Sequence, residues 1–259
     1  LSLLGEFTVS AYYYTMNKPI YFMHVAKAAG STVNDVIAQQ FSTDEVALHF
    51  ESIPIEDNHI LQKKKFISGH PFYYSAKKRL PFIDGFFKVT VFRKPTNQLM
   101  SHIAWVRRLA EPQNLMQFYK HAKHFQEMAI RLKNMDLSCP KELAAFANTL
   151  NKFEQTTFSN FQTRYLIPKS PDNISLADFN IIKNVLSEFD IIGTTESLDV
   201  FFMALFKAMN WVYPEDICNQ NIAGEYFGLD PEDPAQQDAL FPLLKHDLRL
   251  YDIISKNCV

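Results

Sequence analysis

The chain has 259 residues, of which 47% are hydrophobic and 21% charged, so it is long and apolar enough to bury a sizeable core. Its formal net charge of -2 argues against bulk binding to nucleic acid or to an anionic membrane surface. Its three cysteines, Cys139, Cys218 and Cys258, lie far apart, which indicates neither a disulfide framework nor a cysteine zinc site and favours a reducing compartment.

The first strong pattern in the chain is a strand, a loop of small residues and a helix. The run PIYFMHV at 19–25 is short, apolar and bounded by a proline, which predicts a buried strand. Apolar residues then recur at helical spacing between 31 and 41. Lys27 and a group of small residues stand between these two elements.

Further strands and helices alternate along the rest of the chain. Strands are predicted at 65–69, 86–92 and 189–193, whereas 44–50 fits no clear pattern. Helices are predicted at 96–109, 141–153, 175–188, 201–209 and 238–254, with a polar, helix-favouring stretch at 113–134. This order predicts an α/β fold with a central, mostly parallel sheet flanked by helices. We interpret 16–259 as a single domain and 1–15 as an N-terminal extension or an added segment.

The loop that follows the first predicted strand has the composition of an anion site. In a parallel sheet, ligands bind at the carboxyl ends of the strands, where a helix that begins there presents unpaired N–H groups. Small residues let a phosphate approach these amides, Ser31 and Thr32 add hydroxyl groups, and Lys27 adds a full charge. The same residues also fit a plain helix cap by Ser31 beside a surface lysine, and both interpretations stand.

A nucleotide kinase or ATPase is the first enzyme class to compare with this loop. Its pattern GxxxxGK[ST] has lysine directly before Ser or Thr, whereas Lys27 precedes the small residues. The strand that ends at Phe92 is followed by Arg93 and not by a carboxylate for magnesium. The metal half of a phosphoryl-transfer site is therefore not apparent, and a small-molecule kinase with an atypical loop stays as an alternative.

Arg93 and Ser101 form a second candidate contact for an anion. Arg93 follows the strand at 86–92, and its planar guanidinium suits a phosphate group. Ser101 lies two helical turns later, on about the same side of the predicted helix, so it can donate to the same anion. A surface ion pair is the alternative role for Arg93.

Three segments in order, FMHVAKAAGSTV, GHPFYY and VTVFRKPTNQLMSHIAWVRR, resemble the carbohydrate sulfotransferases of the heparan-sulfate type. The resemblance continues through NFQTRYL, FDIIGTTESLDVFF and LKHDLRLYDII, and so covers 20–254. It implies a P-loop-NTPase-like sulfotransferase fold and the use of 3′-phosphoadenosine 5′-phosphosulfate (PAPS) as co-substrate. The chain departs from the family at Ala28-Ala29, where the family has Thr-Gly, and at Lys94, where it has an acidic residue.

The resemblance also implies roles for individual residues. His70 matches the histidine after the family's second strand and would be the general base, although a structural loop histidine is the alternative. Lys27 would stabilise the bridging oxygen of the leaving phosphate, and no metal is expected because a sulfate ester carries less negative charge than a phosphate ester. The expected nucleotide contacts are Lys27, Ala28, Ala29, Gly30, Ser31, Thr32, Val33, Arg93, Ser101, Gln162, Thr163 and Arg164.

Three other histidines are given less weight. His24 is expected to be a packed position on the first strand. His121 and His124 are three residues apart in a helix-favouring stretch, where a metal pair is possible but a solvated face is the preferred interpretation.

Together these observations predict a PAPS-dependent sulfotransferase that acts on a hydroxyl group of a saccharide or of a small metabolite. A degenerate domain that binds an anion without turnover is a second alternative, suggested by Ala28-Ala29. No nucleic-acid partner and no integral membrane segment are expected, since no apolar run approaches bilayer length. Few cysteines and a start at Met16 suit a bacterial cytoplasmic enzyme, and the Golgi lumen would suit a truncated eukaryotic member.

Overall fold

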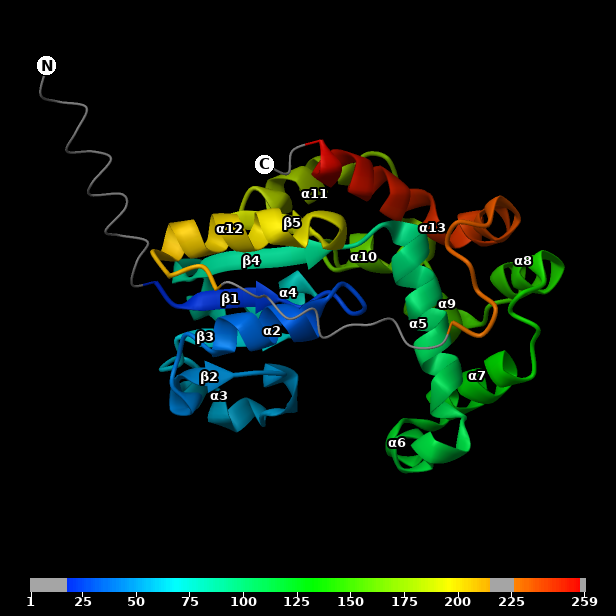
Figure 1. Cartoon of the computed structure of the whole chain (residues 1–259), viewed down its shortest axis with the longest axis horizontal. Coiled ribbons are helices and arrows are strands. Elements are labelled where there is room, and N and C mark those ends of the chain that lie inside the picture. Colours follow the sequence, from blue (N-terminus) through cyan, green and yellow to red (C-terminus); the bar gives the residue numbers. More distant parts are fainter. Residues whose placement is uncertain (1–17, 215–225, 257–259) are drawn as a thin grey trace, which may run out of the picture.

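The protein is built on a five-stranded sheet in which all strands are parallel, in the order β2-β3-β1-β4-β5 (Figure 1). The computed structural model describes residues 18–214 and 226–256, so the expectation for 1–15 lies outside the described residues. The strands are β1 (Ile20–Met23), β2 (Val46–Ala47), β3 (Phe66–Gly69), β4 (Phe87–Phe92) and β5 (Ile191–Thr194). The predicted α/β class with a parallel sheet is confirmed.

Helices follow the strands and extend beyond them. They are α2 (Gly30–Ala38), α3 (Asn58–Leu61), α4 (Tyr73–Arg79), α5 (Pro95–Leu109), α6 (Leu115–Lys120), α7 (Lys123–Lys133), α8 (Pro140–Asn148), α9 (Lys152–Phe158), α10 (Phe161–Arg164), α11 (Asp178–Leu186), α12 (Leu198–Met209) and α13 (Pro234–Ser255). Proline suits the first turn of a helix, and it stands there in α5, α8 and α13.

Several helix boundaries differ from the predicted ones for local reasons. The stretch 113–134 holds two helices, α6 and α7, and not one. The helix predicted at 141–153 ends at Asn148, because Asn151 starts α9 by accepting hydrogen bonds from the N–H groups of Phe153 and Glu154. Helix α13 begins at Pro234, four residues before the predicted start, where Asp233 caps the N–H of Ala235 at 2.9 Å.

Helices cover both faces of the sheet because successive strand side chains point to opposite faces. On one face Ile20, Phe22 and Val89 pack against apolar residues of α2 and α12. On the other face Tyr21 and Met23 pack in a cluster with residues of α4, α11 and the second half of α13. A third apolar cluster joins α5, α6, α7, α8, the end of α9 and the first half of α13. Figure 1 shows α5 to α9 beyond the arrowheads of the strands, on the carboxyl side of the sheet.

The order of the strands fixes where a ligand is expected. The chain leaves β1 toward β2 and β3 on one side and leaves β4 toward β5 on the other, so the direction of winding reverses between β1 and β4. In open parallel sheets the ligand crevice lies at this reversal, at the carboxyl ends of the strands. Among the helices of the described residues, none has both the length and the apolar character that crossing a membrane requires.

Candidate anion-binding site

A cavity of about 1090 Å³ lies at the predicted crevice, at the carboxyl ends of β1 and β4. Its walls come from the loop after β1 and from α2, α5, α9 and α10. The structure thus brings residues from both halves of the chain to one place. The predicted site residues that line the cavity are Lys27, Ala29, Gly30, Ser31, Thr32, His70, Arg93, Ser101 and Arg164.

The cavity is rich in positive charge. Lys27, Arg93, Arg108 and Arg164 line it, whereas Glu196 is the one carboxylate among the described residues that line it. The two oxygens of Glu196 accept hydrogen bonds from the N–H of Lys94 and the hydroxyl of Tyr251, both at 2.9 Å. Burial, together with the charges of Arg108 and Arg93, lowers the pKa of Lys27. An anion in the cavity would relieve this repulsion, so the site is suited to an anionic ligand.

The backbone of the loop is turned so that the start of α2 faces the cavity. Lys27 and Ala29 adopt left-handed conformations with φ of 67° and 56°. The N–H of Ala28 donates to the carbonyl of Val25 at 3.2 Å, and that of Val33 donates to Ala29 at 3.1 Å. Because these two amides already donate within the protein, the expected phosphate contacts of Ala28 and Val33 are not available, and both side chains lie in the core. The amides of residues 29–32 precede the first hydrogen bond of the helix and remain for a ligand.

Arg93 is held from several sides. One guanidinium nitrogen donates to the carbonyl of Lys27 and the other to the hydroxyl of Tyr226, each at 3.2 Å. The side chain of Gln162 makes two hydrogen bonds to the backbone of Arg93. Its oxygen accepts from the Arg93 N–H at 2.9 Å, and its nitrogen donates to the Arg93 carbonyl at 2.8 Å. These hydrogen bonds fix the position of the Arg93 guanidinium at the carboxyl end of β4.

Gln162 and Thr163 do not line the cavity, although both were expected to contact the nucleotide directly. Burial raises the pKa of Asp247 to about 6. Its carboxyl group accepts hydrogen bonds from the N–H of Gln162 at 3.2 Å and from the N–H and hydroxyl of Thr163 at 2.7 and 2.6 Å. The two residues are therefore positioning residues: both tie α10 to α13, and Gln162 also holds the backbone of Arg93. This role depends on contacts with a residue far along the chain, and no local pattern signals it.

Arg164 does line the cavity, in agreement with its expected position. It donates to the carbonyl of Thr156, and its guanidinium lies 5.2 Å from the centre of the Phe72 ring. Burial lowers its pKa. Its buried Nε has no hydrogen-bond partner among the described residues, which leaves a donor for a ligand.

His70 is in the state that a general base needs. Its Nδ1 lies 2.9 Å from the carbonyl oxygen of His24. Because a carbonyl only accepts, Nδ1 carries the proton and Nε2 keeps its lone pair. Burial lowers the pKa of His70, while Glu51 opposes the shift. The ring is consequently neutral at pH 7 and can take a proton at Nε2.

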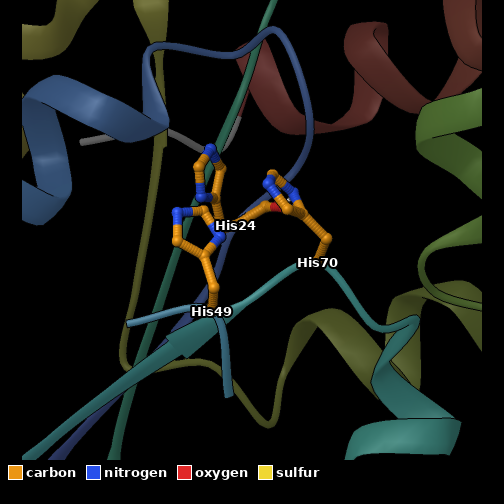
Figure 2. A group of neighbouring side chains, drawn as sticks. All are labelled: His24, His49 and His70. Carbon is orange, nitrogen blue, oxygen red and sulfur yellow. Dashed lines mark hydrogen bonds between the residues drawn. The ribbon is translucent and has the colours of Figure 1, made fainter. Parts of the chain in front are cut away.

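His24 and His49 stand beside His70, and Figure 2 shows the three rings gathered at the ends of neighbouring strands. The ring centres of His24 and His70 are 4.0 Å apart, and His49 lies 5.3 Å from His70 and 5.9 Å from His24. His24 is buried, as expected, and a Cβ at Gly30 would fall 1.8 Å from its Nε2. Burial, with lesser effects of neighbouring charges, lowers the pKa of His24 to about 2. Sequence reasoning missed this cluster.

The other pair considered, His121 and His124, does not share a helix. His121 follows the end of α6, and His124 lies in α7, where its ring stacks on Phe153 with centres 4.4 Å apart.

His102 makes the fold sensitive to acid. Burial lowers its pKa to about 3, so below pH 6.5 the unfolded chain binds a proton there that the folded chain does not. Stability from this residue is present above pH 6.5 and is lost as the pH falls. His102→Phe, which keeps a ring among Phe158 and Phe161, is expected to reduce the loss of unfolding free energy between pH 7 and pH 5 by about 2 kcal/mol.

Urea unfolding at the two pH values measures this difference. His59→Phe is the control, because His59 is exposed. An unchanged pH dependence in His102→Phe would contradict the assignment.

Comparisons of the chain with protein-family models, with curated proteins and with solved structures gave no match.

Proposed function

We propose that the protein is a PAPS-dependent sulfotransferase, which moves a sulfuryl group from PAPS to a hydroxyl group of a saccharide or of a small metabolite. One observation carries the proposal: Lys27, Arg93 and Ser101, whose side chains suit phosphate groups, line the same cavity as the neutral His70. Lys27 and the start of α2 suit a 5′-phosphosulfate, and Arg93 with Ser101 suits a 3′-phosphate. A nucleotide with phosphate groups at both ends of its ribose matches this pair of contacts.

The proposed chemistry is an in-line displacement at sulfur. The acceptor oxygen attacks the sulfur while Nε2 of His70 removes the hydroxyl proton. The bond between sulfur and the bridging oxygen breaks, and its electron pair stays on the 5′-phosphate. Lys27 stabilises the charge that develops on this oxygen. The carbonyl of His24 accepts from Nδ1–H and so stabilises the imidazolium that forms.

The resemblance to carbohydrate sulfotransferases supports the same assignment, including the finer one of a P-loop-NTPase-like sulfotransferase fold. Ala29 stands where that family has glycine, and its φ of 56° is a conformation that glycine adopts more easily. Alanine keeps the backbone amide at a cost of about 1–2 kcal/mol. The substitution therefore changes the stability of the loop and not the groups that it offers.

The charges in the cavity favour sulfuryl transfer over the kinase alternative. Phosphoryl transfer with magnesium needs carboxylate ligands beside the phosphates. Glu196, the one carboxylate among the described lining residues, already accepts hydrogen bonds at both oxygens. In the proposed sulfuryl transfer no carboxylate ligands for magnesium are needed. The cations and amides of the cavity would bind the sulfuryl donor.

The proposal is tested by calorimetric titration with 3′-phosphoadenosine 5′-phosphate (PAP). Saturable binding is expected, with weaker binding of adenosine 5′-phosphate because it lacks the group for Arg93 and Ser101. An absence of saturable PAP binding would contradict the proposal.

Labelled PAPS is then supplied with a panel of sugars, lipids and small alcohols, and products are read by mass spectrometry. PAP binding without transfer would favour the degenerate domain, and magnesium-dependent ATP turnover would favour the kinase.

A further inference from the structure

We propose that His24, His49 and His70 bind one divalent transition-metal ion of the zinc class at the carboxyl edge of the sheet. The proposal does not rest on the sulfotransferase assignment, but an ion bound at Nε2 of His70 would occupy the lone pair that the proposed base uses, so the metal-bound form would not accept the acceptor's proton. His24 directly follows β1, His70 directly follows β3, and His49 comes two residues after β2. These three strands are parallel neighbours, so their carboxyl ends deliver three imidazoles to one point.

The spacing of the rings suits a single ion. Each histidine offers one nitrogen, and these nitrogens all lie within 4.8 Å of one another. Zinc–nitrogen bonds of about 2.0–2.1 Å in tetrahedral geometry place two ligand nitrogens about 3.3 Å apart. Small rotations of the rings would bring the nitrogens from within 4.8 Å of one another to the tetrahedral spacing. His49 is exposed and His70 is partly exposed, so neither ring is fixed by a closed core around it.

Two of the rings already have the outer partners that metal-bound histidines use. The Nδ1 of His70 faces the carbonyl of His24 at 2.9 Å, and the Nδ1 of His49 lies 3.5 Å from a carboxylate oxygen of Glu51. The other oxygen of Glu51 accepts from the N–H of His70 at 3.3 Å. Contacts of this kind orient the rings and leave Nε2 for the ion.

The third ring holds a buried nitrogen that no described residue contacts by a hydrogen bond. His24 is 6% exposed, and its Nδ1 has no hydrogen-bond partner within 18–214 and 226–256. A buried polar atom without a partner costs about 1–3 kcal/mol, and coordination of an ion would remove that cost. The backbone of His49 is left-handed, with φ of 52°. Strained conformations of this kind are common at ligand sites, and this one lies beside the other two rings.

Charge and ligand type decide which ion the cluster prefers. Lys27 lies close enough to lower the pKa values of His24 and His70, so it also repels a cation, and Glu51 offsets one positive charge. Imidazole nitrogens suit zinc and its neighbours in the transition series and suit magnesium and calcium poorly. Three protein ligands leave a fourth position for water or an anion, and His24, His49 and His70 all line the cavity.

The test is a calorimetric titration of chelator-treated protein with zinc chloride at pH 7, without nucleotide. We expect one zinc ion per chain, and no comparable binding of magnesium. His49→Ala is the main variant because the side chain is exposed and its removal leaves the core intact. It should weaken zinc binding by more than about 100-fold, which exceeds the effect of losing an outer partner. His59→Ala removes another exposed histidine and should bind zinc as the wild type does.

Cobalt provides a spectroscopic check on the ligands. A tetrahedral cobalt complex absorbs strongly in the visible range, and this band should appear in the wild type and be lost in His49→Ala and in His24→Gln. Wild-type protein that binds no zinc, or His49→Ala that binds it equally well, would overturn the proposal. Zinc binding in a protein that fails to bind PAP would leave the metal site standing and refute only the proposed sulfotransferase, so the two proposals fail separately.

Discussion

Arg93→Ala is expected to weaken PAP binding by about 10- to 100-fold, because charge-assisted hydrogen bonds to phosphate contribute about 1.5–3 kcal/mol. The guanidinium is anchored by Lys27 and Tyr226 at 3.2 Å each, so its planar fork is oriented before the ligand arrives. Calorimetry measures the change. Arg93→Lys keeps the charge without the fork and should fall between the wild type and Arg93→Ala.

Lys94→Ala is the matched control for the Arg93 variants. Lys94 is the next residue, but its amine pairs with Glu232 at 3.0 Å and it does not line the cavity. Its loss should leave PAP affinity within a factor of about two, because exposed ion pairs contribute little. Lys27→Ala should weaken PAP binding as Arg93→Ala does. PAP affinity unchanged in Arg93→Ala and Lys27→Ala would remove the two-anchor interpretation of the cavity.

His70→Ala is expected to reduce sulfuryl transfer by about 10²- to 10⁴-fold, the contribution of a well-placed general base. PAP affinity should change little, because the proposed nucleotide contacts come from other residues. The expected signature is a fall in kcat with an unchanged Kd for PAP. Since burial lowers the pKa of His70, activity should also persist at pH values below 6.5, where an exposed histidine would already be charged.

Two observations separate a base from a merely structural histidine. Added imidazole should restore part of the activity of His70→Ala, because it can occupy the space and accept the proton. His59→Ala should retain full activity. A His70→Ala protein that loses PAP binding together with transfer would make His70 a structural residue of the loop.

The parallel sheet could be predicted because its strands carry their own signal. Strands buried on both faces are continuous apolar runs. The runs at 19–25, 65–69 and 86–92 contain β1, β3 and β4, and the run at 189–193 covers β5 except for its last residue, Thr194. The rule for parallel sheets placed the loop after β1 at the ligand edge, and the family resemblance implied that Arg93 binds the same nucleotide. Lys27 and Arg93 both line one cavity in the structure.

The remaining parts of the site depend on features that leave no pattern in the sequence. Strand β2 has only two residues, too few to show a period, so His49 was not linked to His24 and His70. Gln162 and Thr163 take their roles from Asp247, which is 84 residues beyond Thr163. The amides of Ala28 and Val33 are used within the loop and helix, which only the backbone conformation reveals.

The link from Asp247 through α10 to Arg93 joins α13 to the end of β4. Gln162 holds the Arg93 backbone, and Asp247 holds the amide of Gln162. A sideways shift of α13 is thereby transmitted through α10 to the position of a guanidinium in the cavity. We therefore expect substitutions in α13 that displace Asp247 to change the affinity of the cavity for an anionic ligand, although Asp247 does not line it.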